Sequence, residues 1–224
     1  MDAIAGRTSL EITAPGVGIR EDRISSLGWL RGYGRVSPVM DADILLSPTI
    51  EDSQHQFEVV RLLGVDILSD RPFRDYELVN EEIPRRITTQ EFLSLLTDPY
   101  AVVLTDSFAR RHALAVDDSV TMQVGDRVVV LRIAGILGNE GPASVLNGNF
   151  ALMDIAAAQW VLGRLGQVDR IDIRLVDSIS VDQAEQEIVA RLPDGLGVQR
   201  PERRGVEVER MLRAFHFNLT ALSF

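Results

Sequence analysis

Alternation of polar and apolar positions predicts strand–helix–strand units at both ends of the chain. Residues 8–14 (TSLEITA) alternate as a half-buried strand does. Apolar side chains at Ile24, Leu27 and Leu30 follow, a spacing that gives a helix one apolar face. The first unit is therefore predicted to contain a strand (8–14), a helix (20–31), one or two strands broken by Pro38 (35–46) and a further strand (56–65). The second is predicted to contain a strand (170–176), a helix (181–192) and a short strand beginning at Val198.

The middle of the chain is richer in strands and follows a polar, proline-containing connection at residues 70–86, the best candidate for a domain boundary. Gly125-Asp126, between two apolar alternating runs, is typical of a hairpin turn. Residues 138–149 are rich in glycine and asparagine and predict a loop. The predicted elements are a helix (88–96), a strand (101–105), a helix (107–114), two strands (119–124 and 127–136), a strand (150–153) and a helix (155–165). This order indicates a discontinuous domain that carries a β-rich insertion.

Residues 205–224 differ in pattern from the rest of the chain. Their apolar side chains are spaced four and three residues apart, as in a coiled-coil seam: Val208, Leu212, Phe215, Leu219 and Leu222. As a helix the segment would be about 30 Å long, and its second half is almost entirely apolar. We expect a stalk helix whose seam contacts a partner and which continues toward a membrane. The alternative is a terminal helix packed on the core.

Composition limits the chemistry that the chain can perform. An apolar fraction of 46% and a charged fraction of 25% are ordinary for a globular protein. The net charge of -10 argues against nucleic acid as a partner, because nucleic-acid binders need a basic face. The chain has no cysteine and no lysine, which excludes thiol nucleophiles, disulfides, P-loop lysines and Schiff bases.

Motif searches give no catalytic, cofactor-binding or metal-binding residues. Residues 16–21 (GVGIRE) resemble the start of a dinucleotide fingerprint, but Glu21 replaces the third glycine and would repel a pyrophosphate. His55, His112 and His216 lie in three different predicted elements, without the i, i+4 spacing of a metal pair. We therefore predict a non-enzymatic protein without cofactors.

Several segments, in this order, resemble the periplasmic region of ABC-transporter permeases of the FtsX/MacB type. The resemblance covers nearly the whole chain, and it rests on the order of the segments more than on any one of them. The segments are residues 5–12 (AGRTSLEI), 36–39 (VSPV), 63–66 (LGVD), 101–105 (AVVLT), 107–111 (SFARR), 120–125 (VTMQVG), 133–137 (IAGIL), 153–159 (MDIAAAQ) and 168–173 (VDRIDI).

The resemblance implies an α+β fold with two parts. A porter-like α/β part would comprise residues 1–75 and 166–204, and an inserted, β-rich sabre-like part residues 76–165. Residues 205–224 would then be the stalk that leads into a transmembrane helix.

The resemblance also implies a non-catalytic role on the periplasmic, extracytoplasmic face of the bacterial inner membrane. Such a domain would transmit ATP-driven motion and bind a substrate or partner. The implied partners are an ABC ATPase subunit, reached through the full-length permease, a second permease protomer or domain, and a periplasmic protein or lipoprotein. Besides the 205–224 seam, composition offers the 138–149 loop and Trp29 as contact surfaces. A stand-alone soluble enzyme and a membrane-anchored scaffold or adhesion module are the alternative hypotheses.

Overall fold

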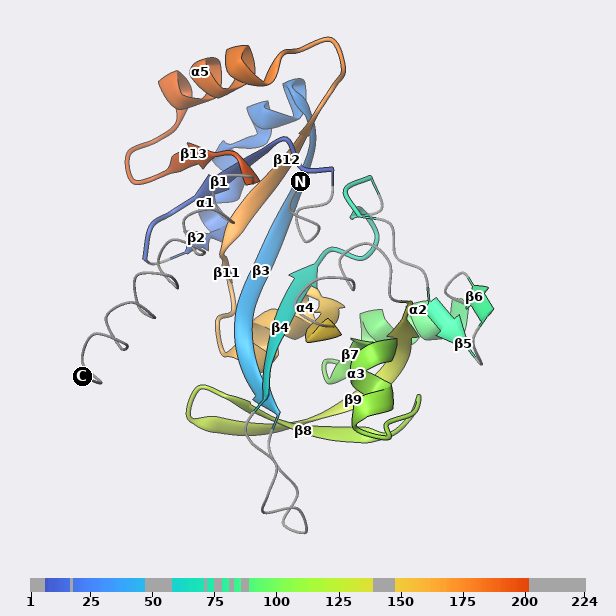
Figure 1. Cartoon of the computed structure of the whole chain (residues 1–224). Helices are drawn as coiled ribbons and strands as arrows, with labels where there is room; N and C mark the ends of the chain where they lie inside the picture. The colour runs from blue at the N-terminus through green and yellow to red at the C-terminus, as the bar shows by residue number, and fades with distance from the viewer. Residues whose placement is uncertain are drawn as a thin grey trace, which may run out of the picture.

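The computed structural model of the chain describes residues 7–16, 18–46, 58–70, 72–74, 78–80, 83–85, 89–138 and 148–201. Most of the strands belong to one 11-stranded sheet with the order β13-β1-β12-β3-β4-β10-β7-β9-β5-β6, in which β8 pairs with β3 and β9 (Figure 1). These strands are β1 (Leu10–Thr13), β3 (Gly34–Leu46), β4 (Glu58–Val65), β5 (Leu78–Asn80), β6 (Ile83–Arg85), β7 (Ala101–Thr105), β8 (Ser119–Val124), β9 (Arg127–Leu137), β10 (Phe150–Asp154), β12 (Arg170–Leu175) and β13 (Gly197–Gln199). A separate pair consists of β2 (Ile19–Arg20) and β11 (Gln167–Val168).

The described helices are short and few beside this sheet, so the predicted α+β class is confirmed. They are α1 (Glu21–Ser26), the 3-10 helix η1 (Gly28–Gly32), α2 (Thr89–Thr97), α3 (Asp106–Arg111), α4 (Ile155–Leu162) and α5 (Val181–Arg191). In the described part of the chain, none of them combines the length and hydropathy of a membrane span.

Strands from the two ends of the chain lie next to each other in the sheet. β1 is paired on one side with β12, with Leu10 opposite Ile173, and on the other side with β13. Together with α1, η1 and α5 these strands form one end of the molecule, and β7, β8, β9 and α3 gather at the other end (Figure 1). The two strand–helix–strand units predicted at the ends of the sequence thus build a single structure.

The long strand β3 connects the two ends of the molecule. It contains 13 residues, so Pro38 does not divide it as the sequence pattern allowed. Residues 34–39 pair with β12, and residues 39–46 pair with β4 on the other edge. Because each half of the strand has its own partner, β3 belongs to both ends of the sheet.

One apolar cluster covers the face of the sheet on which most helices pack. It includes Ile12 and Ile173 at one end, Met40 and Leu62 in the middle and Phe108 of α3 at the other end, all nearly or completely buried. A smaller cluster on the opposite face contains Leu95 of α2 together with residues of β7 and β10. The main core therefore runs through the whole sheet.

Gly64 allows α4 to lie directly on the strands. A Cβ atom at this position of β4 would come within 2.4 Å of the Cβ atom of Ala158 in α4. Alanine side chains at 157 and 158 are likewise buried in this contact. The alanine side chains of the helix therefore lie directly against the backbone of β4 at this point.

Some predicted elements differ from those observed. The helix expected at residues 20–31 is split into α1 and η1, and the connection expected at 70–86 contains the hairpin strands β5 and β6. The hairpin at Gly125-Asp126 is confirmed: β8 and β9 pair across it, and Gly125 has a φ of 60°. This value suits a turn with glycine at its first central position.

Candidate functional site

A buried ion network occupies the face of the sheet opposite the main core. Strand alternation places Glu11, Ser37 and Asp172 on this face, because their neighbours Leu10, Ile12 and Ile173 belong to the core cluster. Glu11 lies directly opposite Asp172 in the β1–β12 pair, and Asp172 lies directly opposite Ser37 in the β12–β3 pair. All three polar side chains are almost fully buried.

Arg170 lies at the centre of the network. Its Nε donates to Oδ1 of Asp172 at 2.8 Å, and one of its terminal nitrogens donates to Oδ2 of Asp41 at 2.5 Å. The carboxylate of Glu11 lies 3.4 Å from Nε. Burial acts to lower the pKa of Arg170, but the charges of Asp172, Asp41 and Glu11 outweigh it and raise the pKa. Arg170 therefore stays charged inside the protein and joins β1, β12 and β3.

Arg74 connects the segment after β4 to the same carboxylate. Its side chain is fully buried and lies between Asp70, at 2.6 Å, and Asp172. Ser37 in turn donates to Asp70 at 3.3 Å, and the backbone carbonyl of Phe73 accepts a hydrogen bond from Arg7 N–H at 2.8 Å. The start of the predicted polar connection is therefore packed on the sheet by buried ionic contacts.

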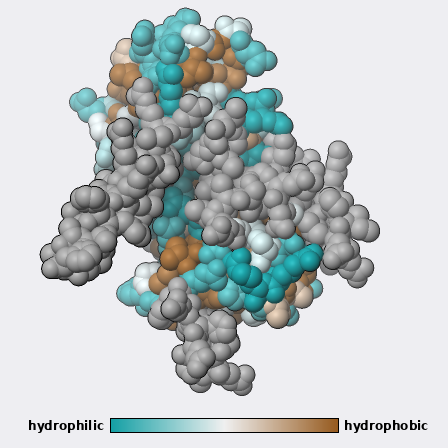
Figure 2. All heavy atoms as spheres, viewed as in Figure 1, coloured by the Kyte–Doolittle hydropathy of each residue, from teal (hydrophilic) through white to brown (hydrophobic). Residues whose placement is uncertain are grey.

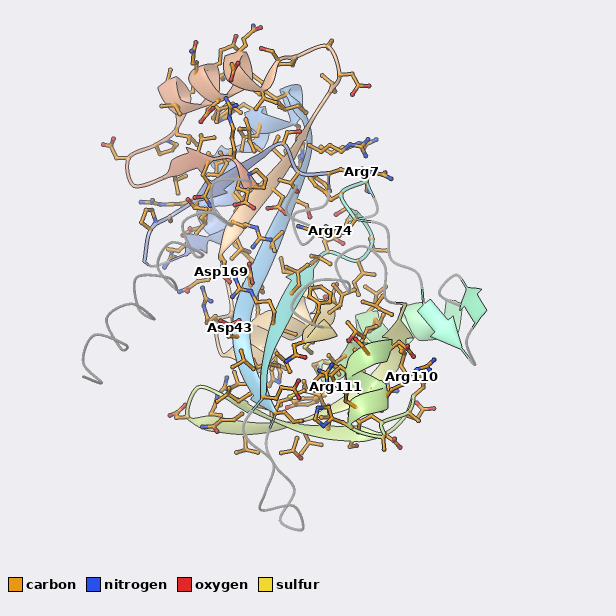
Figure 3. The ribbon with its side chains drawn as sticks, in the orientation of Figure 1. Arg7, Asp43, Arg74, Arg110, Arg111 and Asp169 are labelled. Carbon is orange, nitrogen blue, oxygen red and sulfur yellow. The ribbon has the colours of Figure 1, made fainter. Side chains whose placement is uncertain are left out.

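A second set of ionic contacts continues from the network along the middle of the sheet (Figure 3). Arg61 of β4 contacts both Asp41 and Asp43 of β3. Burial acts to lower the pKa of Arg61, but the charges of Asp41 and Asp43 and the hydrogen bonds to them together outweigh burial and raise the pKa. Asp169, which precedes β12, accepts a hydrogen bond from the backbone N–H of Asp41 at 2.8 Å and forms an ion pair with Arg164.

The ionisable side chains of this site are paired with one another. Its carboxylates are engaged by arginines, and the described residues contain no group of three or more histidine, aspartate or glutamate side chains able to hold a metal. Buried, paired charges of this kind hold strands in one register, since shifting a strand would leave a charge without its partner. The arrangement therefore fixes the register of β1, β12 and β3 relative to one another.

Only some of the residues predicted to contact a partner lie in the part of the chain that the structure describes. Val208, Leu212, Phe215, Leu219 and Leu222 lie outside the described residues, so the seam stays a prediction. Trp29 is half-buried against the main core, with the guanidinium of Arg191 4.3 Å from its ring centre. It therefore helps to hold α5 onto η1.

Most of the 138–149 loop lies outside the described residues, but its last residue is anchored. Asn149 donates to the carbonyl of Val59 at 3.0 Å and accepts a hydrogen bond from Arg111. His112 contacts Glu58 at 2.6 Å, whereas His55 and His216 fall outside the described part of the chain.

The glycine turn before α1 is used for packing. A Cβ atom on Gly18 would lie 2.9 Å from the carbonyl oxygen of Val168. The backbone N–H of Glu21 donates to Gly166 O at 2.9 Å, and its carboxylate accepts from Gln159 at 2.7 Å. The first N–H of α1 is thus already engaged by the protein, and a carboxylate lies beside it.

The sequence reasoning missed an exposed apolar patch around Trp160 of α4. Trp160 is 50% exposed and donates to Tyr100 Oη at 3.2 Å, while Val128 and Val130 of β9 are 66% and 55% exposed. Shallow depressions of 390 and 380 Å³ lie beside the indole. In the view of Figure 2, hydrophobic side chains also gather beneath α5 and near the β8–β9 hairpin. The apolar character of the whole α4 sequence gave no signal that its tryptophan faces outward.

Comparison with known proteins gives consistent matches. Residues 35–191 match the family described as MacB-like periplasmic core domain. An uncharacterized ABC transporter permease protein of Mycobacterium tuberculosis is 26% identical over 225 aligned residues, which cover 99% of this chain. The chain spans only 24% of that relative's length.

Two solved structures share the fold. The extracellular domain of the noncanonic ABC-type transporter YknZ from Gram-positive bacteria has a TM-score of 0.56 at 11% identity, over 86% of this chain and 100% of that chain. The periplasmic region of MacB from Actinobacillus actinomycetemcomitans also has a TM-score of 0.56, at 12% identity, over 92% of this chain and 94% of that chain.

Proposed function

We propose that this chain, which belongs to the family of MacB-like periplasmic core domains, is the extracytoplasmic module of an ABC-transporter permease and transmits ATP-driven motion as a stiff body. In this proposal the full-length permease works with an ABC ATPase subunit and a second permease protomer. The module itself binds a substrate or a partner protein outside the membrane, and it performs no chemistry.

The observation that carries the proposal is the strand β3 with the ion network across it. β3 runs between the two ends of the sheet and pairs with β12 in its first half and β4 in its second. Arg170 and Arg74 connect the neighbouring strand and the segment after β4 to the carboxylates of Asp41 and Asp172. A module that passes displacement from a membrane to a partner needs such stiffness, since a soft sheet would absorb the motion.

We also propose the two-part division, with residues 1–75 and 166–204 forming a porter-like part and 76–165 an inserted sabre-like part. The placement of β1, β12, β13 and α5 at one end and of β7, β8, β9 and α3 at the other supports it (Figure 1). The parts would share one sheet, because β10 pairs in parallel with β4. Residues 205–224 complete the proposal as a stalk toward the membrane.

The stiffness is tested with two spin labels in the full-length permease assembled with its ATPase. The chain has no cysteine. Once any cysteines elsewhere in the permease are replaced by serine, Val189→Cys on α5 and Val128→Cys on β9 place one label at each end, on side chains that are 56% and 66% exposed. With labelled permease diluted into an excess of unlabelled permease, so that only distances within one protomer are measured, we expect a narrow distribution by double electron–electron resonance that stays the same with and without ATP. A distribution that broadens or shifts on addition of ATP would show that the module deforms, contrary to the proposal.

The location is tested with the single variant Val128→Cys. A membrane-impermeant maleimide should label it in cells whose cytoplasmic membrane is intact. A matched cysteine placed in the ATPase subunit should react only after permeabilisation. If Val128→Cys also requires permeabilisation, the extracytoplasmic assignment is wrong.

A further inference from the structure

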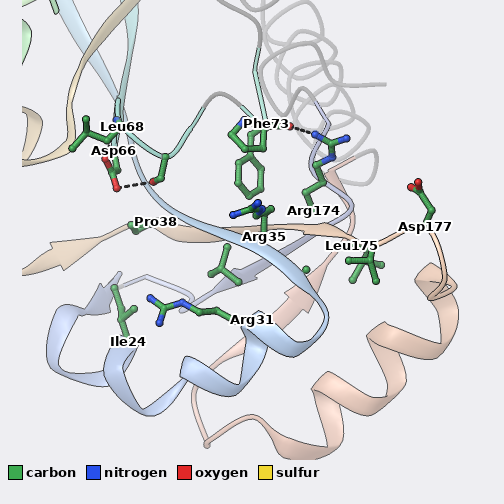
Figure 4. Close-up of a pocket in the computed structure, with 15 residues that line it drawn as sticks. Ile24, Arg31, Arg35, Pro38, Asp66, Leu68, Phe73, Arg174, Leu175 and Asp177 are labelled. Carbon is green, nitrogen blue, oxygen red and sulfur yellow. Dashed lines mark hydrogen bonds between the residues drawn. The ribbon is translucent and has the colours of Figure 1, made fainter.

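A groove of 1340 Å³ lies beside the first half of β3 (Figure 4). One wall is β3 itself, along residues 34–38, and the other is formed by residues 66–69 and 72–73 after β4. Apolar side chains of Ile24, Val36 and Leu68 contribute to the lining. The groove therefore runs along a strand edge and offers both apolar and main-chain surface.

The strand edge that faces this groove has no partner strand in the described part of the chain. β4 pairs with β3 only from Val39 onward, while β12 occupies the opposite edge. The Val176 N–H donates to Tyr33 O at 3.0 Å, so alternation directs the N–H and C=O groups of Gly34 and Val36 away from β12. Unpaired edge groups of this kind accept an added strand.

The groove concentrates positive charge on a protein whose net charge is -10. Arg31, Arg35 and Arg174 line it, from η1, β3 and β12 respectively (Figure 4). Arg31 and Arg35 are exposed and form no ion pair with any residue that the structure describes, whereas Arg174 donates to the carbonyl of Pro72.

The arginines of the groove outnumber its acidic side chains. Asp66 accepts hydrogen bonds from Leu68 N–H at 3.0 Å and from Ser69 Oγ at 2.6 Å, so its carboxylate caps its own turn. Asp66 and Asp177 are the acidic residues of the lining, against three arginines. The lining therefore keeps a net positive charge, and Arg31 and Arg35 are the exposed cations that an anionic ligand would meet.

We propose that the groove binds an extended, acidic peptide segment of a partner protein, which adds to β3 along residues 34–38. Main-chain hydrogen bonds to Gly34 and Val36 would hold the segment in an extended conformation, and Arg31 and Arg35 would select acidic side chains. The inference rests on the proposed function for the origin of the peptide, since that function requires a partner outside the membrane.

The probe is a fluorescein-labelled peptide of alternating glutamate and valine, titrated with the 224-residue chain and followed by anisotropy. Two control peptides isolate the two interactions: one replaces each glutamate with lysine, and the other carries N-methyl groups on alternate amides. We expect each control peptide to bind about tenfold more weakly or worse, because one loses charge complementarity and the other loses strand pairing. Equal binding of the N-methylated peptide would overturn strand addition.

The variants Arg31→Glu/Arg35→Glu and Arg20→Glu/Arg23→Glu locate the site. Both change the net charge equally, but Arg20 and Arg23 are exposed on or next to α1 and do not line the groove. With the thermal midpoint of each variant measured as a folding control, the first should weaken peptide binding about tenfold and the second about twofold at most. Equal losses in the two variants would overturn the groove as the site.

A vesicle experiment separates a peptide partner from a lipid. If phosphatidylglycerol vesicles bind the chain through Arg31 and Arg35 while the acidic peptide does not bind, the groove is a lipid site and the proposal is wrong. All these measurements use the chain without a membrane, so their failure would leave the proposed function standing. Failure of the maleimide test, in contrast, would leave the peptide affinity unchanged.

Discussion

Arg74 and Arg170 are almost completely buried, although arginine is seldom found inside a protein. Asp172 lies between them and accepts from both, and Asp70 and Asp41 supply the further negative charges. Such pairs add little stability as a whole, because burial removes both charges from water. Removing one member of a buried pair lowers the stability strongly, because its partner keeps its charge without an opposite charge or water beside it.

We therefore expect Arg74→Met to lower the free energy of unfolding by about 3–5 kcal/mol. The substitution removes the buried ion pair between Arg74 and Asp70, and it removes one of the two arginines that contact Asp172. Urea titration followed by circular dichroism measures the change. The loss in the double variant Asp70→Asn/Arg74→Met should be smaller than in the single variant, because position 70 then no longer carries the charge that was paired with Arg74.

Arg20→Met is the matched control for this prediction. Arg20 is paired with Asp22 through side chains that are 70% and 60% exposed, and solvent screens such a pair. Its urea midpoint should match that of the wild type. If Arg20→Met lowered the free energy of unfolding as much as Arg74→Met does, burial of the ion pair would not be the cause of the lower stability.

The buried ions could not be predicted from the sequence. Arg74 and Asp172 are 98 residues apart, and the segment around Arg74 has the polar, proline-containing composition of a surface connection. In RIDIRLV, the alternation correctly indicated a strand with one polar face, but such a face is normally solvated. In the folded protein the segment after β4, which carries Arg74, covers the polar face of β12, and the local sequence of β12 contains no sign of this.

Among the contacts between elements, an ionic one joins β4 to the end of α3 through the carboxylate of Glu58. Glu58, the first residue of β4, contacts Arg111 at 2.7 Å and His112 at 2.6 Å. Partial burial acts to raise the pKa of Glu58, but hydrogen bonds with His112 and Asn149 and the charge of Arg111 lower it overall. The ionised carboxylate is therefore the form that holds α3 to the strand.

Glu58→Gln should be less stable than the wild type at pH 7, and the difference should shrink as the solution is acidified. A lowered folded-state pKa means that the carboxylate stabilises the protein above its unfolded pKa of about 4.3 and loses this effect as pH falls through the folded value. Thermal midpoints of both proteins between pH 7 and pH 3 measure the effect. A difference independent of pH would mean that the contact acts through shape alone.

Elements with a clear hydrophobic pattern were predicted well, and very short ones were missed. The strand at 101–105 has the predicted bounds, because a fully apolar run is enclosed between polar residues. β2 and β11 contain two residues each, too few to display alternation. Pro38 interrupts neither β3 nor its pairing with β12, because by the alternation of the β3–β12 pair its missing N–H is on the edge that faces the groove.

The molecule as a whole should unfold cooperatively, although the proposed division gives it two parts. Ile12, Ile173 and Ala184 lie in the same core cluster as Val102 and Phe108. Residues from both proposed parts are thus buried together, and a shared core couples their unfolding.

The two tryptophans test this coupling, because each reports on one proposed part. Trp29→Phe leaves Trp160 as the only indole, and Trp160→Phe leaves Trp29. In each variant we expect the urea midpoint from tryptophan fluorescence to coincide with that from circular dichroism. If fluorescence and circular dichroism give different midpoints in one variant, the parts unfold separately and the common core is not sufficient to couple them.

For the architecture of the whole molecule, the resemblance to a family was a better predictor than the hydrophobic periodicity. The order of several weak segments indicated an FtsX/MacB-type periplasmic region, and the family match over residues 35–191 confirms it. Periodicity alone predicted the strands without their order in the sheet. The neighbours of β3 include β12, which begins more than 120 positions later in the chain, and local patterns do not encode such long-range pairing.

The position of β1 between β12 and β13 has a consequence for the moment at which the protein can fold. During synthesis, Leu10 emerges long before Ile173, its partner in the sheet, so the first strand waits unpaired while most of the chain is still being made. The same delay applies to passage through a translocation pore, because the sheet cannot close until the later strands have arrived. Throughout that interval β1 presents an open strand to its surroundings, which makes a holding chaperone or rapid delivery valuable to the nascent chain.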